Sequence, residues 1–215
     1  MTTGQDAVVL VHGLWVHGIA MGLMRRRVAR CGYRALAYSY PSMRLTLVEN
    51  AERLAHFCRG LAAPRLHYVG HSLGGLLILR MLERTPGLPA GRVVLAGAPV
   101  AGSLAARRLA RLPGGRAALG RSAPEWHESA RPVSGTGREI GVIAGSLPLG
   151  IGRFVAPDLP APSDGVVSVA ETRLPAMRDH IVLNVSHSGM LISRAVARQI
   201  CVFLHDGAFE HRRDG

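Results

Sequence analysis

The chain has 215 residues and a formal net charge of +12, a length typical of one compact domain, here residues 1–215. Hydrophobic residues make up 48% and charged residues 19% of the sequence, which excludes a disordered chain. The apolar runs are broken before they reach 18 residues, so no membrane span is expected. Because residues 1–6 place no positive charge ahead of an apolar run, they do not resemble a signal peptide, and we expect a cytoplasmic protein.

The three cysteines are Cys31, Cys58 and Cys201. Their number is odd, they lie far apart, and no C-x-x-C pattern occurs. The sequence therefore predicts neither a disulfide framework nor a zinc ribbon.

The positive charge comes entirely from arginine, since all 26 basic residues are Arg. They are spread along the chain, with local clusters at 25–27 and 107–111. A solvated basic surface is one interpretation, and an anion-binding surface, including weak association with an anionic membrane, is the other. No helix-turn-helix pattern and no basic motif with interleaved aromatics is present, so nucleic acid is not expected as a partner.

Short apolar runs alternate with helical patterns along the chain. The runs predict buried strands at 7–11, 33–40, 66–69, 92–96, 140–144 and 181–185. Apolar residues at helical spacing predict helices at 21–31, 47–61, 73–82, 104–112 and 191–204. Thr46 and Glu49 form a capping-box pattern ahead of the second helix, and Ser103 is placed to cap the fourth.

This alternation predicts an α/β fold with a mostly parallel six-stranded sheet and helices on both faces. Such sheets carry their active sites at the carboxyl ends of the strands. Polar residues that directly follow strands are therefore the first candidates for chemistry.

Gly70-His71-Ser72-Leu73-Gly74 is a G-x-S-x-G sequence between a predicted strand and a predicted helix. A tight turn at this place lifts the serine hydroxyl out of the sheet at a helix N-terminus, and the glycines avoid side-chain clashes. The alternative is a glycine-rich turn with an incidental serine. The strand-turn-helix context favours Ser72 as a nucleophile.

A serine nucleophile needs a base that a third group orients. His187 follows the last predicted strand and is our candidate base, whereas His180, His205 and His211 lie at less suitable places. Asp164 is our candidate acid, ahead of its competitors Asp158 and Glu171. An acid at this place would fix the tautomer of the imidazole and stabilise its charged form.

An oxyanion needs two backbone N–H donors. We expect one from Leu73, which follows the serine, and the other from Leu14, in the loop after the first strand. Gly13 would let that loop turn. Trp15 either lines an acyl pocket or packs against the first helix.

At this point the sequence resembles the α/β-hydrolases of the small bacterial lipase and esterase kind. The resemblance rests on motifs in the family's order, namely Val11-His12-Gly13, Gly70 to Gly75, Gly97-Ala98-Pro99, Asp164-Gly165 and His187. It implies the minimal form of the α/β-hydrolase fold, a serine nucleophile, a small-molecule ester or thioester substrate, and neither cofactor nor metal. Hydrolysis of a carboxylic ester is the expected activity, with a thioesterase, an acyltransferase or a non-catalytic basic binding protein as alternatives.

The segment at about 100–137 falls where this family inserts a cap. Its predicted helix carries leucines on one side and arginines around the other. Such a helix could close over the site or touch an anionic interface. The alternative is a surface helix whose leucines complete the core.

Overall fold

The computed structural model describes residues 4–122, 137–150 and 152–211. At its centre lies a six-stranded sheet in the order β2-β1-β3-β4-β5-β6. Every neighbouring pair is parallel, so the predicted fold class is confirmed. The strands are β1 (Ala7–Val11), β2 (Arg34–Tyr38), β3 (Leu66–His71), β4 (Val93–Ala96), β5 (Ile140–Gly145) and β6 (Asp179–Leu183).

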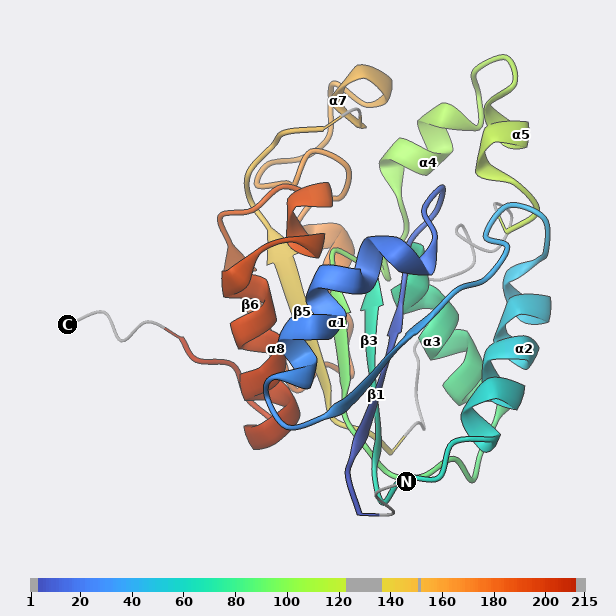
Figure 1. The fold of residues 1–215 in the computed structure, drawn as a ribbon. Coiled ribbons are helices and arrows are strands. Elements are labelled where there is room, and N and C mark those ends of the chain that lie inside the picture. The colour runs from blue at the N-terminus through green and yellow to red at the C-terminus, as the bar shows by residue number, and fades with distance from the viewer. Residues whose placement is uncertain (1–3, 123–136, 151, 212–215) are drawn as a thin grey trace.

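Helices cover both faces of the sheet (Figure 1). On one face lie α2 (Leu47–Arg59) and α3 (Leu73–Arg84), and on the other lie α1 (Gly22–Ala29) and α8 (Arg194–Asp206). Shorter helices stand above the carboxyl ends of the strands: α4 (Leu104–Leu109), α5 (Gly115–Leu119) and α7 (Gly152–Val155). The described residues also contain three 3-10 turns: η1 (Gly18–Met21), η2 (Ala170–Thr172) and η3 (Ser188–Leu191).

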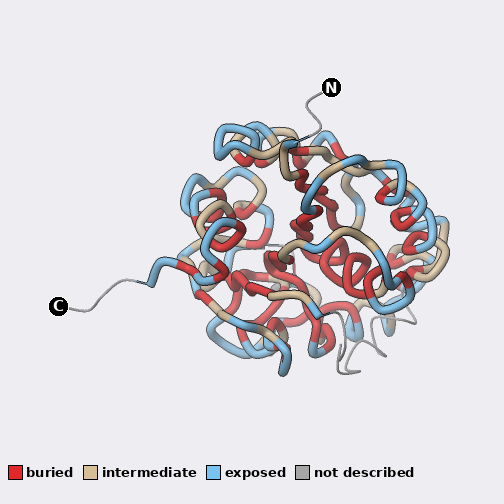
Figure 2. The backbone as a smooth tube through the Cα atoms, turned by 90° about the horizontal axis from the view of Figure 1, so that it is seen from below, coloured by how far each residue is buried: buried red, intermediate tan, exposed pale blue. Residues whose placement is uncertain are grey.

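The sheet separates two hydrophobic cores. Successive residues of a strand point to opposite faces, so Val9 packs with α2 and α3, whereas Val8 and Leu10 pack with α1 and α8. All five residues of β1 are fully buried, as expected for a central parallel strand covered on both sides. Figure 2 shows this buried interior surrounded by exposed loops.

Two predicted helix starts are confirmed by their hydrogen bonds. The Thr46 side chain accepts from the Glu49 N–H while Glu49 accepts from the Thr46 N–H, which completes the capping box of α2. The Ser103 hydroxyl accepts from the N–H of Ala106 and caps α4.

Several element boundaries differ from the prediction. β6 starts at Asp179 and ends at Leu183, two residues earlier than expected, and α4 ends at Leu109. Helix α5 was not predicted, because its two leading glycines weaken the helical pattern. Of the expected cap-like insertion, residues 123–136 lie outside the described part of the chain.

The expectation for the cysteines is wrong in one respect, since Cys31 and Cys201 form a disulfide. The two residues are 170 positions apart in sequence, but α1 and α8 lie side by side on the same face and bring their Cα atoms to 6.2 Å. The long separation of Cys31 and Cys201 in sequence was therefore no argument against a bond between them. Cys58 remains a free, buried thiol.

Within the described residues, no helix is both long enough and apolar enough to cross a membrane.

Candidate active site

Ser72 occupies the tight turn between β3 and α3. Its φ of +53° and ψ of −126° lie in a region that residues with a side chain rarely adopt. The turn is held by the Ser72 N–H, which donates to the carbonyl of Ala96 at 3.0 Å. Gly74 lets α3 approach β1 closely, because a Cβ there would overlap the carbonyl oxygens of Val11 and His12.

Asp164 and His187 are joined by a hydrogen bond in which Nδ1 of His187 donates to Oδ2 of Asp164 at 2.7 Å. The His187 N–H also donates to the Asp164 carbonyl at 2.9 Å, so backbone and side chain both link the two loops. His187 follows the end of β6 by four residues, because the strand ends at Leu183. The predicted neighbours therefore meet at the carboxyl end of the sheet.

The Asp164 carboxylate is completely buried. Its other oxygen, Oδ1, accepts from the N–H groups of Val166 at 2.9 Å and Val167 at 2.7 Å. Two backbone donors on one oxygen and the imidazole of His187 on the other thereby fix the carboxylate in position.

The competing acids have other partners. Asp158 forms an exposed ion pair with Arg108 at 2.5 Å, and the Glu171 carboxylate accepts from the N–H groups of Leu104 and Ser168. Neither contacts His187 among the described residues. The competing histidines are likewise placed elsewhere: His180 contacts Thr172, His205 contacts Asp206, and His211 contacts Asp179.

A pocket of about 220 Å³ opens beside Ser72 and His187. Its wall is mainly apolar and comes from the loops and short helices above the sheet, including Leu14, Trp15, Leu109, Leu119, Val155, Val167 and Leu191. Both Ser72 and His187 line it, although no hydrogen bond joins the serine hydroxyl to His187 within the described residues. Such contacts often tighten only when substrate binds.

Trp15 lines this pocket, which agrees with the first of the two interpretations that the sequence allowed. It has a φ of +61°, and its indole N–H donates to the carbonyl of Ala118 at 2.7 Å. The loop after β1 is thus tied to α5. Leu14, on the same loop, and Leu73, at the start of α3, donate their N–H groups to no other described residue.

His71 is a residue of the site to which the sequence assigned no role. Its Nε2 donates to the carbonyl of His187 at 3.0 Å, and the two rings lie 4.7 Å apart. Burial lowers the pKa of His71 to about 3, with a further decrease from nearby His187. His71 is therefore neutral at ordinary pH, with the proton on Nε2.

His12 supports the loop after β1. Its Nδ1 donates to the carbonyl of Gly13 at 2.8 Å, its Nε2 accepts from the N–H of Tyr40, and its ring stacks on Tyr40 at 4.4 Å. Burial lowers the pKa of His12 as well. The only sequence signal for these two histidines was their place within the motifs at Val11 to Gly13 and at Gly70 to Gly75.

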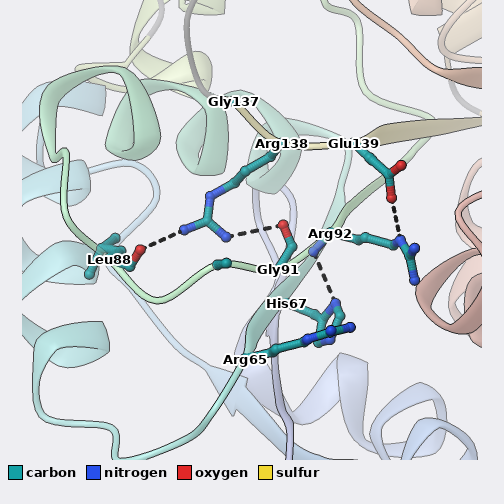
Figure 3. Close-up of a pocket in the computed structure, with 9 residues that line it drawn as sticks. Arg65, His67, Leu88, Gly91, Arg92, Gly137, Arg138 and Glu139 are labelled. Carbon is teal, nitrogen blue, oxygen red and sulfur yellow. Dashed lines mark hydrogen bonds and ion pairs between the residues drawn. The ribbon is translucent and has the colours of Figure 1, made fainter.

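A second hollow, of about 420 Å³, lies at the opposite end of the sheet (Figure 3). Its arginines are engaged in structural contacts: Arg138 donates to the carbonyls of Leu88 and Gly91, and Arg92 pairs with Glu139 at 2.6 Å. These bonds link the starts of β4 and β5. Within the described ranges, no group of three His, Cys, Asp or Glu side chains is placed to hold a metal ion.

The chain is similar to known hydrolases. A sequence model of the alpha/beta hydrolase family matches residues 8–182, whereas no curated protein matches. Mature lipase BlEst2 from Bacillus licheniformis is 19% identical, with a TM-score of 0.74 over 93% of this chain and 90% of that one. The metagenomic carboxyl esterase MGS0156 is 21% identical, with a TM-score of 0.66 over 87% of this chain and 65% of that one. The monoacylglycerol lipase of Paleococcus ferrophilus is 18% identical, with a TM-score of 0.64 over 92% of this chain and 93% of that one.

Proposed function

Since the chain belongs to the alpha/beta hydrolase family, we propose that it is a serine hydrolase that cleaves carboxylic esters through an acyl-enzyme. The observation that carries the proposal is the buried Asp164–His187 hydrogen bond beside Ser72, at the mouth of an apolar pocket. Nucleophile, base and orienting acid are the three groups that such a reaction needs.

In the proposed reaction, Oγ of Ser72 attacks the carbonyl carbon of the ester and its proton passes to Nε2 of His187. The ester C–O bond then breaks, and the departing alcohol takes this proton. Water next attacks the acyl-enzyme, giving a proton to His187, and the acid leaves as Oγ of Ser72 regains that proton. Asp164 holds the imidazole with its hydrogen on Nδ1, the tautomer that leaves Nε2 free to accept.

We assign the oxyanion site to the backbone N–H groups of Leu14 and Leu73. Both residues line or adjoin the pocket at Ser72, and neither N–H is engaged by another described residue. The N–H of Leu73 also stands at the start of α3, where the helix dipole favours negative charge. Two such donors stabilise the negative oxygen that forms when the serine attacks.

The apolar wall of the pocket favours an apolar acyl group as the part of the substrate that binds beside Ser72. Its walls present leucine, valine and tryptophan side chains, and these interact equally well with the chain of an ester or of a thioester. Turnover of a p-nitrophenyl ester, an acyl-CoA and an acyl carrier protein thioester with the same acyl chain would separate these leaving groups. We expect the ester to be preferred.

Fluorophosphonate labelling tests the nucleophile directly. Wild-type protein should be labelled at one site, and Ser72→Ala should lose the label. Ser188→Ala is a matched control, because Ser188 lines the same pocket but has an exposed side chain on η3. Full labelling of Ser72→Ala, or loss of labelling in Ser188→Ala alone, would contradict the assignment of the nucleophile.

Two further expectations concern the domain organisation and the location of the protein. One is a single domain that includes a short cap-like insertion at about 100–137. The other, a cytoplasmic location, is opposed by the Cys31–Cys201 disulfide, because such bonds persist mainly in oxidising compartments. Alkylation of free thiols in intact cells, followed by mass spectrometry of Cys31 and Cys201, would show whether the bond exists where the protein works.

A further inference from the structure

The exposed large hydrophobic side chains gather at one end of the molecule. Of the nine in the described part of the chain, only Val182 lies on a strand. Single exposed apolar residues are ordinary on a protein surface, but their concentration on one end is not. The other eight lie between the carboxyl end of a strand and the helix that runs back from it, on the first turn of that helix, or around α4, α5 and α7: Trp15, Ile19, Leu23, Met43, Leu112, Leu149, Phe154 and Ile192.

These exposed residues continue the wall of the pocket to the outside. Val155 lines the pocket, and its neighbour Phe154 is 88% exposed; Leu191 lines it, and its neighbour Ile192 is 63% exposed. Figure 1 shows the helices involved, α4, α5 and α7, standing together above the sheet. Exposed apolar side chains thus continue the pocket wall at Trp15, Phe154 and Ile192, and no described residue covers them.

Unpaired positive charge lies among these apolar residues. Five exposed arginines on the same segments form no ion pair with any described residue: Arg44, Arg107, Arg111, Arg116 and Arg194. Two further arginines there do have carboxylate partners, Arg108 with Asp158 and Arg121 with Glu49. This end thus combines protruding apolar groups with an excess of positive charge.

We propose that this end, the active-site rim made of those eight apolar residues and five arginines, docks on an anionic phospholipid bilayer. Large apolar side chains interleaved with cationic ones match an interface that is apolar beneath and negative at its surface. An acidic protein would satisfy the arginines but would leave protruding apolar side chains such as Ile19, 92% exposed, without a matching surface. Docking would place the pocket mouth against the lipid, and its use to capture ester substrates rests on the proposed function.

Vesicle co-sedimentation of the full chain tests the proposal. We expect retention by vesicles of phosphatidylcholine mixed with equal parts phosphatidylglycerol, and little retention by phosphatidylcholine alone. A basic side chain close to an anionic surface strengthens binding by about fivefold. Arg111→Glu with Arg116→Glu should therefore weaken binding by about 30-fold or more, and Phe154→Ser with Ile192→Ser by at least ~10-fold.

The matched control reverses two charges at the other end of the molecule. Arg59 and Arg65 are exposed, near the amino ends of the strands, and form no ion pair with a described residue. The double variant Arg59→Glu, Arg65→Glu has the same net charge as Arg111→Glu, Arg116→Glu and should bind vesicles nearly as the wild type does. Equal losses in the two double variants would overturn the proposal, because they would show that net charge alone governs retention.

Two further outcomes would also overturn docking on lipid. One is absence of retention by phosphatidylglycerol vesicles. The other is a concentration-dependent dimer lost in Phe154→Ser, Ile192→Ser, which would assign the rim to a second copy of this chain. Hydrolysis of a water-soluble ester without vesicles should be unchanged in the rim variants, and Ser72→Ala should bind vesicles as the wild type does. Failure of docking and failure of the proposed activity are thereby distinguishable.

Discussion

Replacement of His71 by glutamine should change how the stability of the protein depends on pH. The His71 side chain is 6% exposed and its Nε2 donates to the carbonyl of His187 at 3.0 Å, while its Nδ1 has no partner. Burial, with a smaller effect of His187, lowers its pKa to about 3. A glutamine amide can retain the donor to the carbonyl but cannot titrate.

The magnitude follows from proton linkage. In the unfolded chain a histidine has a pKa of about 6.5, so between that value and about 3 the unfolded chain binds a proton that folded His71 does not. The folded state therefore loses about 1.4 kcal/mol of stability for each pH unit below about 6.5, and nothing above it. Between about pH 6.5 and 4.5 this amounts to about 2.7 kcal/mol for this one residue.

Urea unfolding at neutral pH and near pH 4.5, followed by tryptophan fluorescence, measures the difference. The wild type should lose about 2.7 kcal/mol more than His71→Gln over this interval. Buried His12 and His67, whose pKa values burial also lowers, are present in both proteins, so their contributions cancel. An equal loss in the two proteins would refute the reasoning, since His71 would then be able to take up a proton in the folded state.

Three further predictions concern the site and the framework. Asp164→Asn should lower kcat by about 10⁴-fold, whereas Asp158→Asn should leave it nearly unchanged; the reverse order in ester hydrolysis assays would reassign the acid. Replacement of Cys31 and Cys201 by serine should cost about 2–5 kcal/mol of unfolding free energy, and reductant should lower the Tm of the wild type only. Gly74→Ala should destabilise the protein by about 1–3 kcal/mol or more, because its Cβ meets backbone oxygens; an unchanged urea midpoint would contradict this.

The sequence predicted the sheet well, because a parallel strand covered on both faces must be apolar throughout. β1, Ala7–Val11, has the predicted bounds, and the other strands differ from theirs by one or two residues at an end. The meeting of Asp164 and His187 was predictable for a related reason. Residues that follow parallel strands gather at one edge of the sheet, whatever their distance in sequence.

The remaining features depend on contacts that leave no local pattern. The bond from His71 to the carbonyl of His187 joins residues 116 positions apart, and a backbone acceptor has no sequence signature. The Cys31–Cys201 disulfide requires α1 and α8 to be neighbours on one face, which periodicity alone does not determine. Helix α5 is short and begins at Gly115. Only glycine fits at this position, because a Cβ there would overlap the carbonyl oxygen of Leu109.

These non-local contacts converge on the segment that carries the proposed base. His71 holds the His187 carbonyl, Arg27 on α1 donates to the carbonyl of Ile192 at 2.5 Å, and the disulfide fixes α8 to the end of α1. α1 follows the loop with Leu14, and α8 follows the loop with His187. The same contacts therefore set the position of Leu14, the proposed oxyanion donor, relative to His187, the proposed base. Because a displacement of about 1 Å can cost about 100-fold in rate, the proposed reaction would depend on these residues although they contact no substrate.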